Sequence, residues 1–362
     1  MLLISTLYLR ITNRCNQKCS YCYISEKNTG DVSDSTLSKF IALAEYIQKY
    51  NMWKGLNVKI TGGEILLISL PKLDYLFSAL KKLGISISIN TNGTLLTLDH
   101  VRLFQKYNIQ VGISLDGPRD IHNTRRSNSF DAFEDHAWQL CNTEKFRHGF
   151  ICVINEDSTK HIEEIYEFFK RNKISPRFNP GFPDLTPESW KKTLIYTADR
   201  MFNDNFSIQE GNIREIIQHF MDVKKCNTDK NFRAKWYSNV CDECYQNFIT
   251  VNWDGSVTTC HRLPGLIGFE KYIIGNIDQD LPADILFGPK RQELIKQLYQ
   301  RKEQKCFTCE IYPRCKGGCS HACILYNGSI TAPDPFCGTY QAIYQHVKEK
   351  LEECNYTLPG RM

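Results

Sequence analysis

The sequence lacks any run of 18 apolar residues, any long block of like charge and the basic start of an export signal. The first absence argues against a membrane-spanning helix, and the last argues against secretion. Lysine and arginine (45) barely outnumber aspartate and glutamate (40), and they are scattered, so nucleic-acid binding gains no support. Long-period repeats and low-complexity segments are also missing. The sequence therefore predicts a soluble, cytoplasmic protein with neither a membrane nor a nucleic-acid partner.

Cysteine, in contrast, is abundant, with 16 among 362 residues. Tight spacing in a chain without an export signal favours metal ligation in a reducing compartment over disulfides. Three cysteines lie near the start, and most of the others crowd the last third of the chain. Four stand apart, and we expect them to be small buried apolar residues: Cys141, Cys152, Cys226 and Cys354.

The first 180 residues alternate short β-rich runs with amphipathic helical stretches, which is typical of βα units in a parallel sheet. Six such units predict an α/β fold with a partial (βα)6 TIM-like barrel. A helical linker (181–235) and a small cysteine-rich domain (236–362) with a β-hairpin and a C-terminal helix should follow the barrel (1–180). The expected barrel strands are residues 6–12, 57–60, 85–90, 110–115, 150–154 and 176–179.

Unusual loops follow the first four expected strands. They are the cysteine triplet and residues 61–64, 90–93 and 114–117. In parallel α/β barrels the reactive groups lie on the loops after the strands, so we expect these loops to form one site.

The first of these loops carries Cys15, Cys19 and Cys22. Three thiolates on one loop suit a four-iron cluster whose fourth iron is open to an exchangeable ligand. A zinc site is the alternative, although zinc usually takes two cysteine or histidine pairs and no histidine lies nearby.

The segment from Cys15 to Cys22 resembles the C-x3-C-x-aromatic-C signature of radical S-adenosylmethionine (SAM) enzymes. The resemblance implies that the open iron chelates SAM and that reduction cleaves SAM to methionine and a 5′-deoxyadenosyl radical, which abstracts hydrogen from a substrate. Tyr21 matches the aromatic position that lies near the adenine in this family.

Three other loops resemble the same family. Gly62-Gly63-Glu64 is similar to its GGE motif, in which the carboxylate accepts hydrogen bonds from the SAM ammonium group, although Ile65 stands where the family usually has proline. Asn92 and Ser114 resemble its ribose contacts. A plain Asn-Gly turn is the alternative at Asn92.

Seven cysteines of the last third are Cys244, Cys260, Cys306, Cys309, Cys315, Cys319 and Cys337. Their spacing resembles that of the seven-cysteine SPASM domain, a C-terminal extension of radical SAM enzymes. Asp254-Gly255 independently predicts a tight two-residue hairpin that carries Cys260 toward Cys244. The resemblance implies two auxiliary [4Fe-4S] clusters, and so three clusters in all. A pair of structural zinc sites is the alternative.

The resemblance also implies which cysteines bind each auxiliary cluster. The first would use Cys244, Cys260 and Cys319, with Cys241 as the candidate fourth ligand and Cys323 as its competitor. The second cluster would use Cys306, Cys309, Cys315 and Cys337.

The resemblance predicts a peptide or protein substrate and a low-potential electron donor such as flavodoxin or ferredoxin. We expect hydrogen abstraction from a ribosomally made peptide, with a crosslink as the product. Sulfatase maturation by formylglycine formation, oxidation of a small metabolite and a non-catalytic metal scaffold are the alternatives. His261 follows Cys260, at the position where sulfatase-maturating enzymes have an aspartate that acts as a base. His261 is therefore a candidate base or substrate contact. The alternative is a histidine on the surface with no such role.

Only 14 residues precede Cys15, which leaves no room before it for a leader-binding domain. The expectation is therefore either a standalone leader-binding partner or recognition along the open side of the barrel, by addition of a strand to a sheet edge.

Overall fold

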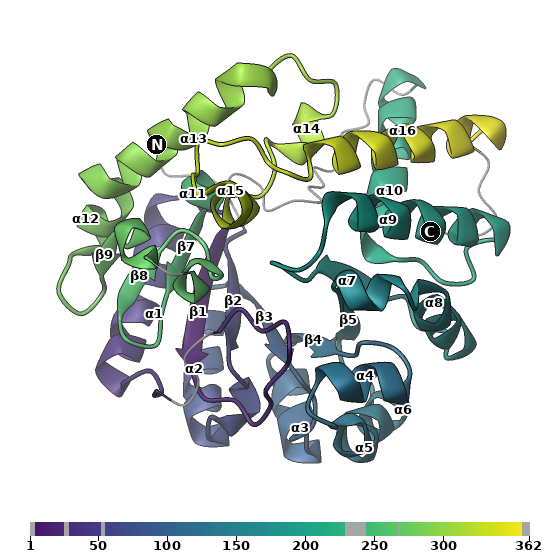
Figure 1. Cartoon of the computed structure of the whole chain (residues 1–362). Helices are drawn as coiled ribbons and strands as arrows, with labels where there is room; N and C mark the ends of the chain where they lie inside the picture. Colours follow the sequence, from purple (N-terminus) through teal and green to yellow (C-terminus); the bar gives the residue numbers. More distant parts are fainter. Residues whose placement is uncertain (1–3, 25–28, 52–54, 229–243, 267, 357–362) are drawn as a thin grey trace. The chain divides into compact units, whose positions relative to one another are not determined.

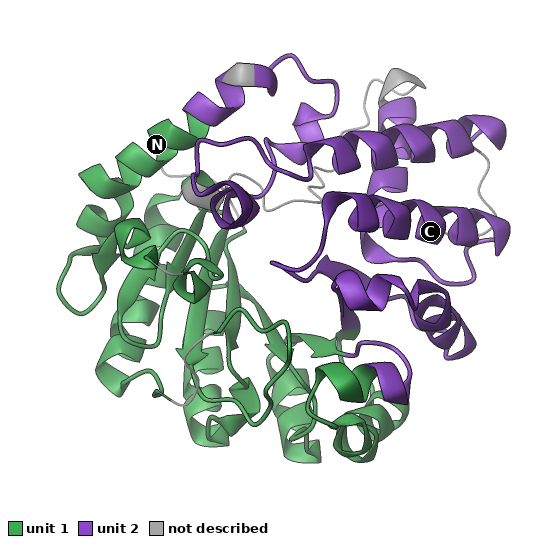
Figure 2. Cartoon of the chain, in the orientation of Figure 1, with its two compact units in different colours: residues 1–114, 122–149, 243–299 green, residues 115–121, 150–242, 300–362 purple. Residues whose placement is uncertain are grey.

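The computed structural model describes residues 4–24, 29–51, 55–228, 244–266 and 268–356 (Figure 1). The chain forms two compact units that each combine distant parts of the sequence (Figure 2). Unit 1 comprises residues 1–114, 122–149 and 243–299, and unit 2 comprises residues 115–121, 150–242 and 300–362. The three-part division of the sequence into barrel, linker and cysteine-rich domain stays a prediction.

Unit 1 is built on a largely parallel sheet in the order β4-β3-β2-β1-β7-β8-β9. Its strands are β1 (Thr6–Thr12), β2 (Asn57–Gly62), β3 (Ser86–Thr91), β4 (Gln110–Ser114), β7 (Phe248–Val251), β8 (Ser256–Thr258) and β9 (Gly275–Asn276). Its helices are α1 (Asp34–Tyr50), α2 (Leu70–Lys82), α3 (Leu98–Lys106), α5 (Phe130–Phe133), α6 (Gln139–Thr143), α11 (Cys244–Asn247) and α12 (Pro282–Phe287). Helices α4 (Arg119–Arg125) and α13 (Pro289–Lys305) have residues in both units.

The strand sequences explain why this sheet has two different faces. Side chains alternate between the two faces of a strand, and in β2 the buried Val58 and Ile60 flank the exposed Lys59. Ile87 and Ile89 of β3 repeat the apolar pattern. The opposite face therefore carries polar residues at matching register positions, with Tyr8, Lys59 and Ser88 in one row.

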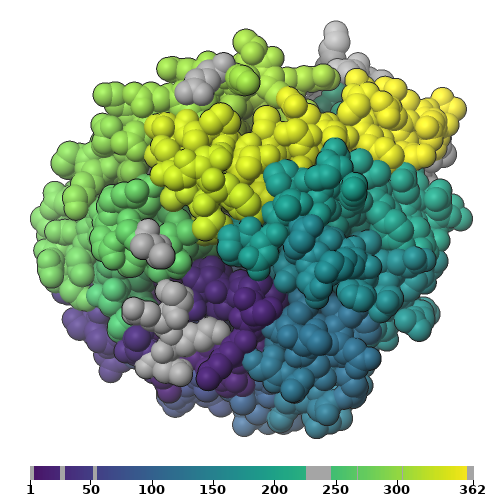
Figure 3. All heavy atoms as spheres, in the orientation of Figure 1, coloured from purple at the N-terminus to yellow at the C-terminus, as the bar shows by residue number. Residues whose placement is uncertain are grey.

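Unit 2 contains the parallel pair β5 (His148–Ile154) and β6 (Arg177–Pro180), of which the first two residues of β5 belong to unit 1. Its helices are α7 (Glu156–Thr159), α8 (Ile162–Arg171), α9 (Pro187–Asn203), α10 (Gly211–Thr228), α14 (Tyr312–Cys315), α15 (Ser320–Asn327) and α16 (Cys337–Glu353). Helix α16 packs along α9, and its yellow spheres lie against teal ones in Figure 3. Thr339 Oγ1 donates to the carbonyl of Pro187 across this pair (2.8 Å).

The parallel α/β fold predicted from the sequence is confirmed, and all six expected barrel strands form within two residues of their expected limits. The predicted hairpin also forms, as β7 and β8. Its predicted two-residue turn is wrong, because Asn252 N–H bonds to Ser256 O (2.9 Å) and leaves three residues in the loop. Gly255 takes the left-handed conformation (φ 82°) that ends such a loop.

The hairpin does not form a sheet of its own. Strand β7 pairs in parallel with β1, with Thr6 opposite Phe248 and Leu9 opposite Val251. The hairpin thus extends the sheet that β1–β4 begin.

The outer edge of β6 is already hydrogen-bonded within unit 2. Phe178 N–H donates to Glu210 Oε1 (2.8 Å), and Phe178 O accepts from Asn212 Nδ2 (2.6 Å). Gly211 N–H bonds to Pro176 O (2.9 Å). This edge is therefore closed to an added strand. At the far edge of the unit 1 sheet, Asn276 N–H of β9 donates to Asp280 Oδ2 (2.7 Å).

No helix in the described part of the chain is long and apolar enough to cross a membrane.

The buried Glu210 predicts a stability effect. Its carboxylate accepts from Phe178 N–H, Ile213 N–H and Asn212 Nδ2. Glu210→Ala should lower the free energy of unfolding by about 1–3 kcal/mol for each donor left buried without an acceptor. Anaerobic thermal unfolding followed by circular dichroism measures the change. Glu210→Gln should lower the free energy of unfolding by less, because its side-chain oxygen still accepts a hydrogen bond. Substitution of the exposed Glu163 by alanine is the control. Equal melting temperatures for all variants would show that the Glu210 hydrogen bonds do not contribute to stability.

Candidate functional site

The three-cysteine loop directly follows β1 in unit 1. Cys15, Cys19 and Cys22 are each half-buried. Gln17 lies between the first two, with its N–H 3.4 Å from Cys15 Sγ and its Oε1 3.5 Å from Cys19 Sγ. Among the described residues no three His, Cys, Asp or Glu side chains are close enough to hold one metal ion. A four-iron cluster does not need that closeness, because each thiolate binds a different iron.

The Gly62-Gly63 backbone lies against this loop. A Cβ added to Gly63 would lie 2.1 Å from Arg14 O, and one added to Gly62 would lie 2.4 Å from Thr12 O. Gly63 N–H bonds to Thr12 O (2.9 Å), and Glu64 N–H bonds to Arg14 O (2.8 Å). Only glycine permits such an approach, so these two residues fix the start of the cysteine loop.

Glu64 joins the loops after β2 and β3. Its carboxylate is 1% exposed and accepts hydrogen bonds from Leu66 N–H (3.0 Å), Thr91 Oγ1 (2.6 Å) and Asn92 N–H (2.7 Å). Burial raises the pKa of Glu64, and these hydrogen bonds oppose the rise. A carboxylate offers about four acceptor positions, so one remains for an external donor such as an ammonium group.

Asn92 is also tied to the cysteine loop. Its Nδ2 donates to Asn16 Oδ1 (2.8 Å), and its Oδ1 accepts from the N–H (3.0 Å) and Oγ1 (2.7 Å) of Thr94. The amide therefore has one donor hydrogen left over for a ligand. Ser114 lies half-buried at the end of β4.

Two arginines that the sequence reasoning missed lie over Tyr21. The guanidinium carbons of Arg125 and Arg126 are 4.9 and 5.4 Å from the centre of its ring. Arg126 Nη1 is 4.0 Å from Cys19 Sγ, and Ser20 N–H bonds to Arg125 O (3.0 Å). The Arg-Arg pair after His122 was the available sequence signal. These cations favour anionic groups at the loop.

A third missed arginine, Arg10 of β1, is 2% exposed beneath the loop. Its Nη2 donates to Asn13 Oδ1 (2.9 Å). Burial lowers its pKa, while Tyr23, Asp254 and Cys22 act in the opposite direction.

His261 contacts both β1 and the residue that follows Cys22. Its ring stacks on Tyr8 (centroids 4.6 Å apart, 16° between planes) and meets Tyr23 edge-on at 5.9 Å. A Cβ on Gly265 would lie 1.8 Å from Tyr23 O, so the segment after His261 packs on the residue that follows Cys22. His261 is therefore half-buried beside the cysteine loop instead of standing on an exposed loop.

The residues expected to bind the first auxiliary cluster are only partly described. Cys241 lies outside the described residues, and for Cys244 the structure describes only its place at the start of α11. Cys260 follows β8 in unit 1 and is buried, whereas Cys319 precedes α15 in unit 2. The ligand set of this cluster stays a prediction.

The four cysteines expected at the second auxiliary cluster all belong to unit 2 and are not joined in disulfides: Cys306, Cys309, Cys315 and Cys337. They lie within electrostatic range of one another. Burial is the largest cause that raises the pKa of Cys337, and Cys306 and Cys309 raise it further. Cys306 and Cys337 likewise raise the pKa of Cys315. Burial raises the pKa of Cys315 to about 12. Cys315 is buried, Cys306 and Cys309 are half-buried, and Cys337 is exposed. Four thiols in one part of unit 2 suit the ligand number of a four-iron cluster.

Cys323, the competing ligand, is fully buried on α15. Its Sγ lies 2.9 Å from Arg301 Nη1.

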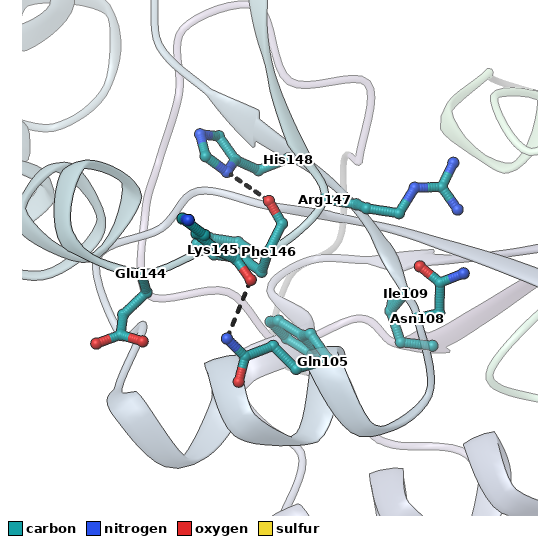
Figure 4. Close-up of a pocket in the computed structure, with 9 residues that line it drawn as sticks. Gln105, Asn108, Ile109, Glu144, Lys145, Phe146, Arg147 and His148 are labelled. Atoms are coloured by element: carbon teal, nitrogen blue, oxygen red, sulfur yellow. Dashed lines mark hydrogen bonds between the residues drawn. The ribbon is translucent and has the colours of Figure 1, made fainter.

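A cavity of about 580 Å³ lies elsewhere in unit 1 (Figure 4). Its wall includes Gln105, whose Nε2 donates to Lys145 O (3.0 Å), and His148. Because it adjoins the residues that precede β4 and begin β5, it lies at the opposite ends of the strands from the cysteine loop.

Comparison with known proteins decides the family. Residues 9–169 match the Radical SAM superfamily, and residues 241–310 match the SPASM iron-sulfur cluster-binding domain. The chain is a radical SAM enzyme with a SPASM domain. This result sets aside the alternative of a non-catalytic scaffold and agrees with the iron-sulfur interpretation of the cysteines.

The similar proteins include a cysteine-type anaerobic sulfatase-maturating enzyme of Clostridium perfringens, which is 25% identical and covers 96% of this chain and 97% of its own length. The solved structure of native anSMEcpe with bound AdoMet and Cp18Cys peptide covers 97% of this chain and 99% of its own, at a TM-score of 0.77 and 22% identity. The structure of Streptococcus suis SuiB bound to precursor peptide SuiA covers 92% of this chain and 75% of its own. Its TM-score is 0.63 and its sequence identity is 18%. The two structures support the fold.

Gly63→Ala tests the close approach that holds the radical SAM domain's cysteine loop. A methyl group 2.1 Å from Arg14 O cannot be accommodated without moving the loop, so SAM affinity should fall at least about tenfold, or ~1.4 kcal/mol. The SAM-dependent change in the electron paramagnetic resonance (EPR) spectrum of reduced protein measures this. Gly149→Ala is the matched control, because nothing lies within 4 Å of its added Cβ. Equal SAM affinity in both variants would contradict the argument.

Proposed function

We propose that this enzyme abstracts a hydrogen atom from a ribosomally made peptide or protein, with a crosslink as the expected product. The observation that carries the proposal is the cysteine loop held against Gly62–Glu64 at the ends of β1 and β2. Cys15, Cys19 and Cys22 would hold a [4Fe-4S] cluster with one open iron. When bound with SAM, this cluster supplies the electron that releases methionine and a 5′-deoxyadenosyl radical.

The residues around the loop take complementary roles in SAM binding. The free acceptor position of Glu64 would receive the SAM ammonium group, and Tyr21 would lie near the adenine. The remaining donor hydrogen of Asn92 and the hydroxyl of Ser114 would contact the ribose. The hydrogen bonds that Glu64 and Asn92 already make hold both side chains in place before SAM arrives.

A crosslink removes two hydrogens from the peptide, and they leave as one hydrogen atom, one proton and one electron. His261 is the candidate for the proton, since its ring is oriented by Tyr8 beside the residue that follows Cys22. The auxiliary cysteine sets would carry the electron, which gives three clusters in all.

A peptide substrate is supported by the relatives. Peptides are bound in the solved anSMEcpe and SuiB complexes. Because both described outer sheet edges are already hydrogen-bonded, we favour a standalone leader-binding partner over strand addition at β6 or β9. A low-potential donor such as flavodoxin or ferredoxin would supply electrons.

Sulfatase maturation is the second candidate. The cysteine-type Clostridium perfringens relative aligns along nearly all of both chains, which favours it. His261 in place of the aspartate expected in those enzymes favours a different reaction.

The first experiment measures SAM cleavage anaerobically. Reconstituted, reduced enzyme should form 5′-deoxyadenosine, and a variant with alanine at Cys15, Cys19 and Cys22 should form none while keeping about eight iron atoms per chain in its two auxiliary clusters. Peptide mass then separates the two candidates: loss of two hydrogens from a candidate precursor peptide indicates a crosslink, and conversion of cysteine to formylglycine in a sulfatase peptide indicates maturation. Absence of 5′-deoxyadenosine from enzyme with filled clusters would refute the proposal.

His261→Ala should reduce peptide modification about 100-fold, because removal of a general base typically costs 10²–10⁴ in rate. Cleavage of SAM without peptide should stay unchanged. His261→Asp should recover part of the activity, since a carboxylate also accepts a proton. Full peptide turnover by His261→Ala with intact clusters would remove His261 from the mechanism.

A further inference from the structure

Two buried cations lie next to the four-cysteine group of unit 2. Arg301 is 3% exposed and Lys302 is fully buried, and both precede Cys306 by about one helical turn. Cys306 N–H bonds to Lys302 O (2.8 Å), which continues the α13 hydrogen-bond pattern to the cysteine. Burial raises the pKa of Cys306, and Arg301 and Lys302 both act against that rise.

Arg301 has hydrogen-bonding capacity that the protein leaves unused. Its Nη1 contacts Cys323 Sγ (2.9 Å), Ser320 Oγ (3.4 Å) and Ile330 O (3.3 Å). Its Nε and Nη2 are buried and have no hydrogen-bond partner among the described residues. A buried guanidinium with two unused donors is costly unless an anion lies close by.

Lys302 is held against the turn that leads from Cys315 to Cys319. A Cβ added to Gly317 would lie 3.1 Å from Lys302 Cγ, 3.4 Å from Lys302 Cε and 3.7 Å from Cys306 Sγ. The Nζ atom lies 5.8 Å from the centre of the Tyr312 ring. The stem of Lys302 and the thiol of Cys306 therefore share one small space beside Gly317.

A buried carboxylate, that of Asp334, also lies near Arg301. Asp334 is 7% exposed and accepts from the N–H groups of Cys319 and Phe336. Arg301 lowers its pKa against the rise that burial causes. A [4Fe-4S] cluster on the four thiolates would place further negative charge near Arg301 and Lys302, and this charge increases on reduction.

We propose that Arg301 and Lys302 are positioning residues that stabilise the electron-rich second auxiliary cluster and raise its reduction potential. The inference rests on the proposed function, because it takes Cys306, Cys309, Cys315 and Cys337 as cluster ligands. Buried positive charge favours the more negative, reduced state of a cluster, so it makes the site a better electron acceptor. The pair would thereby set the direction of electron flow after hydrogen abstraction.

The test is a redox titration, followed by EPR, of full-length protein with alanine at Cys15, Cys19 and Cys22. This variant lacks the ligands of the SAM-binding cluster, so only the auxiliary clusters contribute to the signal. Cys309→Ser in this background identifies the signal of the second cluster by its loss. Lys302→Met keeps the unbranched stem and removes the charge, and Arg301→Met removes the other charge. Each should lower the midpoint potential of that signal by at least about 59 mV, a tenfold change in the one-electron equilibrium.

Two charge controls accompany these variants. Arg301→Lys keeps the charge and should stay close to the parent potential. Lys305→Met removes an exposed cation of the same helix, which acts on Cys337, and screening by solvent should keep its effect small. The Arg301→Met or Lys302→Met variant could instead lose about four iron atoms per chain while Arg301→Lys keeps its full iron content. That result would also support the proposal, because the positive charge would then be needed to retain the cluster.

Parent potentials in both Met variants at full iron content would overturn the inference and leave the proposed function intact. If the background protein binds no iron at Cys306, Cys309, Cys315 and Cys337, the three-cluster part of the proposed function fails instead. Iron content measured beside the potential separates these two results.

Discussion

The backbone contact between Gly62-Gly63 and Thr12-Arg14 positions most of the candidate site. Parallel pairing of β1 and β2 continues past the strand ends through the bonds of Gly63 and Glu64 to the neighbouring carbonyls. This contact places the first cysteine of the loop, and Glu64 then joins it to β3 through Thr91 and Asn92. A single close approach of two backbones thus organises three loops, which explains why the motif tolerates no side chain at either glycine.

Much of this arrangement can be predicted from the sequence. Strand positions follow from apolar alternation, since residues such as Val58 and Ile60 bury one face of the sheet whatever the details of the loops. The cysteine spacing and the Gly-Gly-Glu segment likewise identify the family. Each is a short motif whose role depends on a few residues that are close together in the sequence. Local chemistry and short periodicity are the information that a single sequence carries best.

The features missed depend on contacts between distant segments. Nothing local in residues 248–251 indicates that they pair with β1, and nothing in the Arg125-Arg126 pair indicates that it covers Tyr21. The hairpin turn was misjudged because Asp254-Gly255 fits two loop lengths, and pairing of Asn252 with Ser256 selects the longer one. Buried cations such as Arg10 and Arg301 are equally invisible, because charged residues are expected at the surface until tertiary structure encloses them.

The pairing of β1 with β7 has a consequence for synthesis of the chain. Thr6 emerges from the ribosome long before its partner Phe248. At about 5–20 residues per second, roughly 10–50 s pass before the second neighbour of β1 exists. During that interval the strand that leads to the cysteine loop has one unpaired edge, which is open to association with other chains. This edge of β1 is covered only once residues 248–251 have been translated and have paired with it.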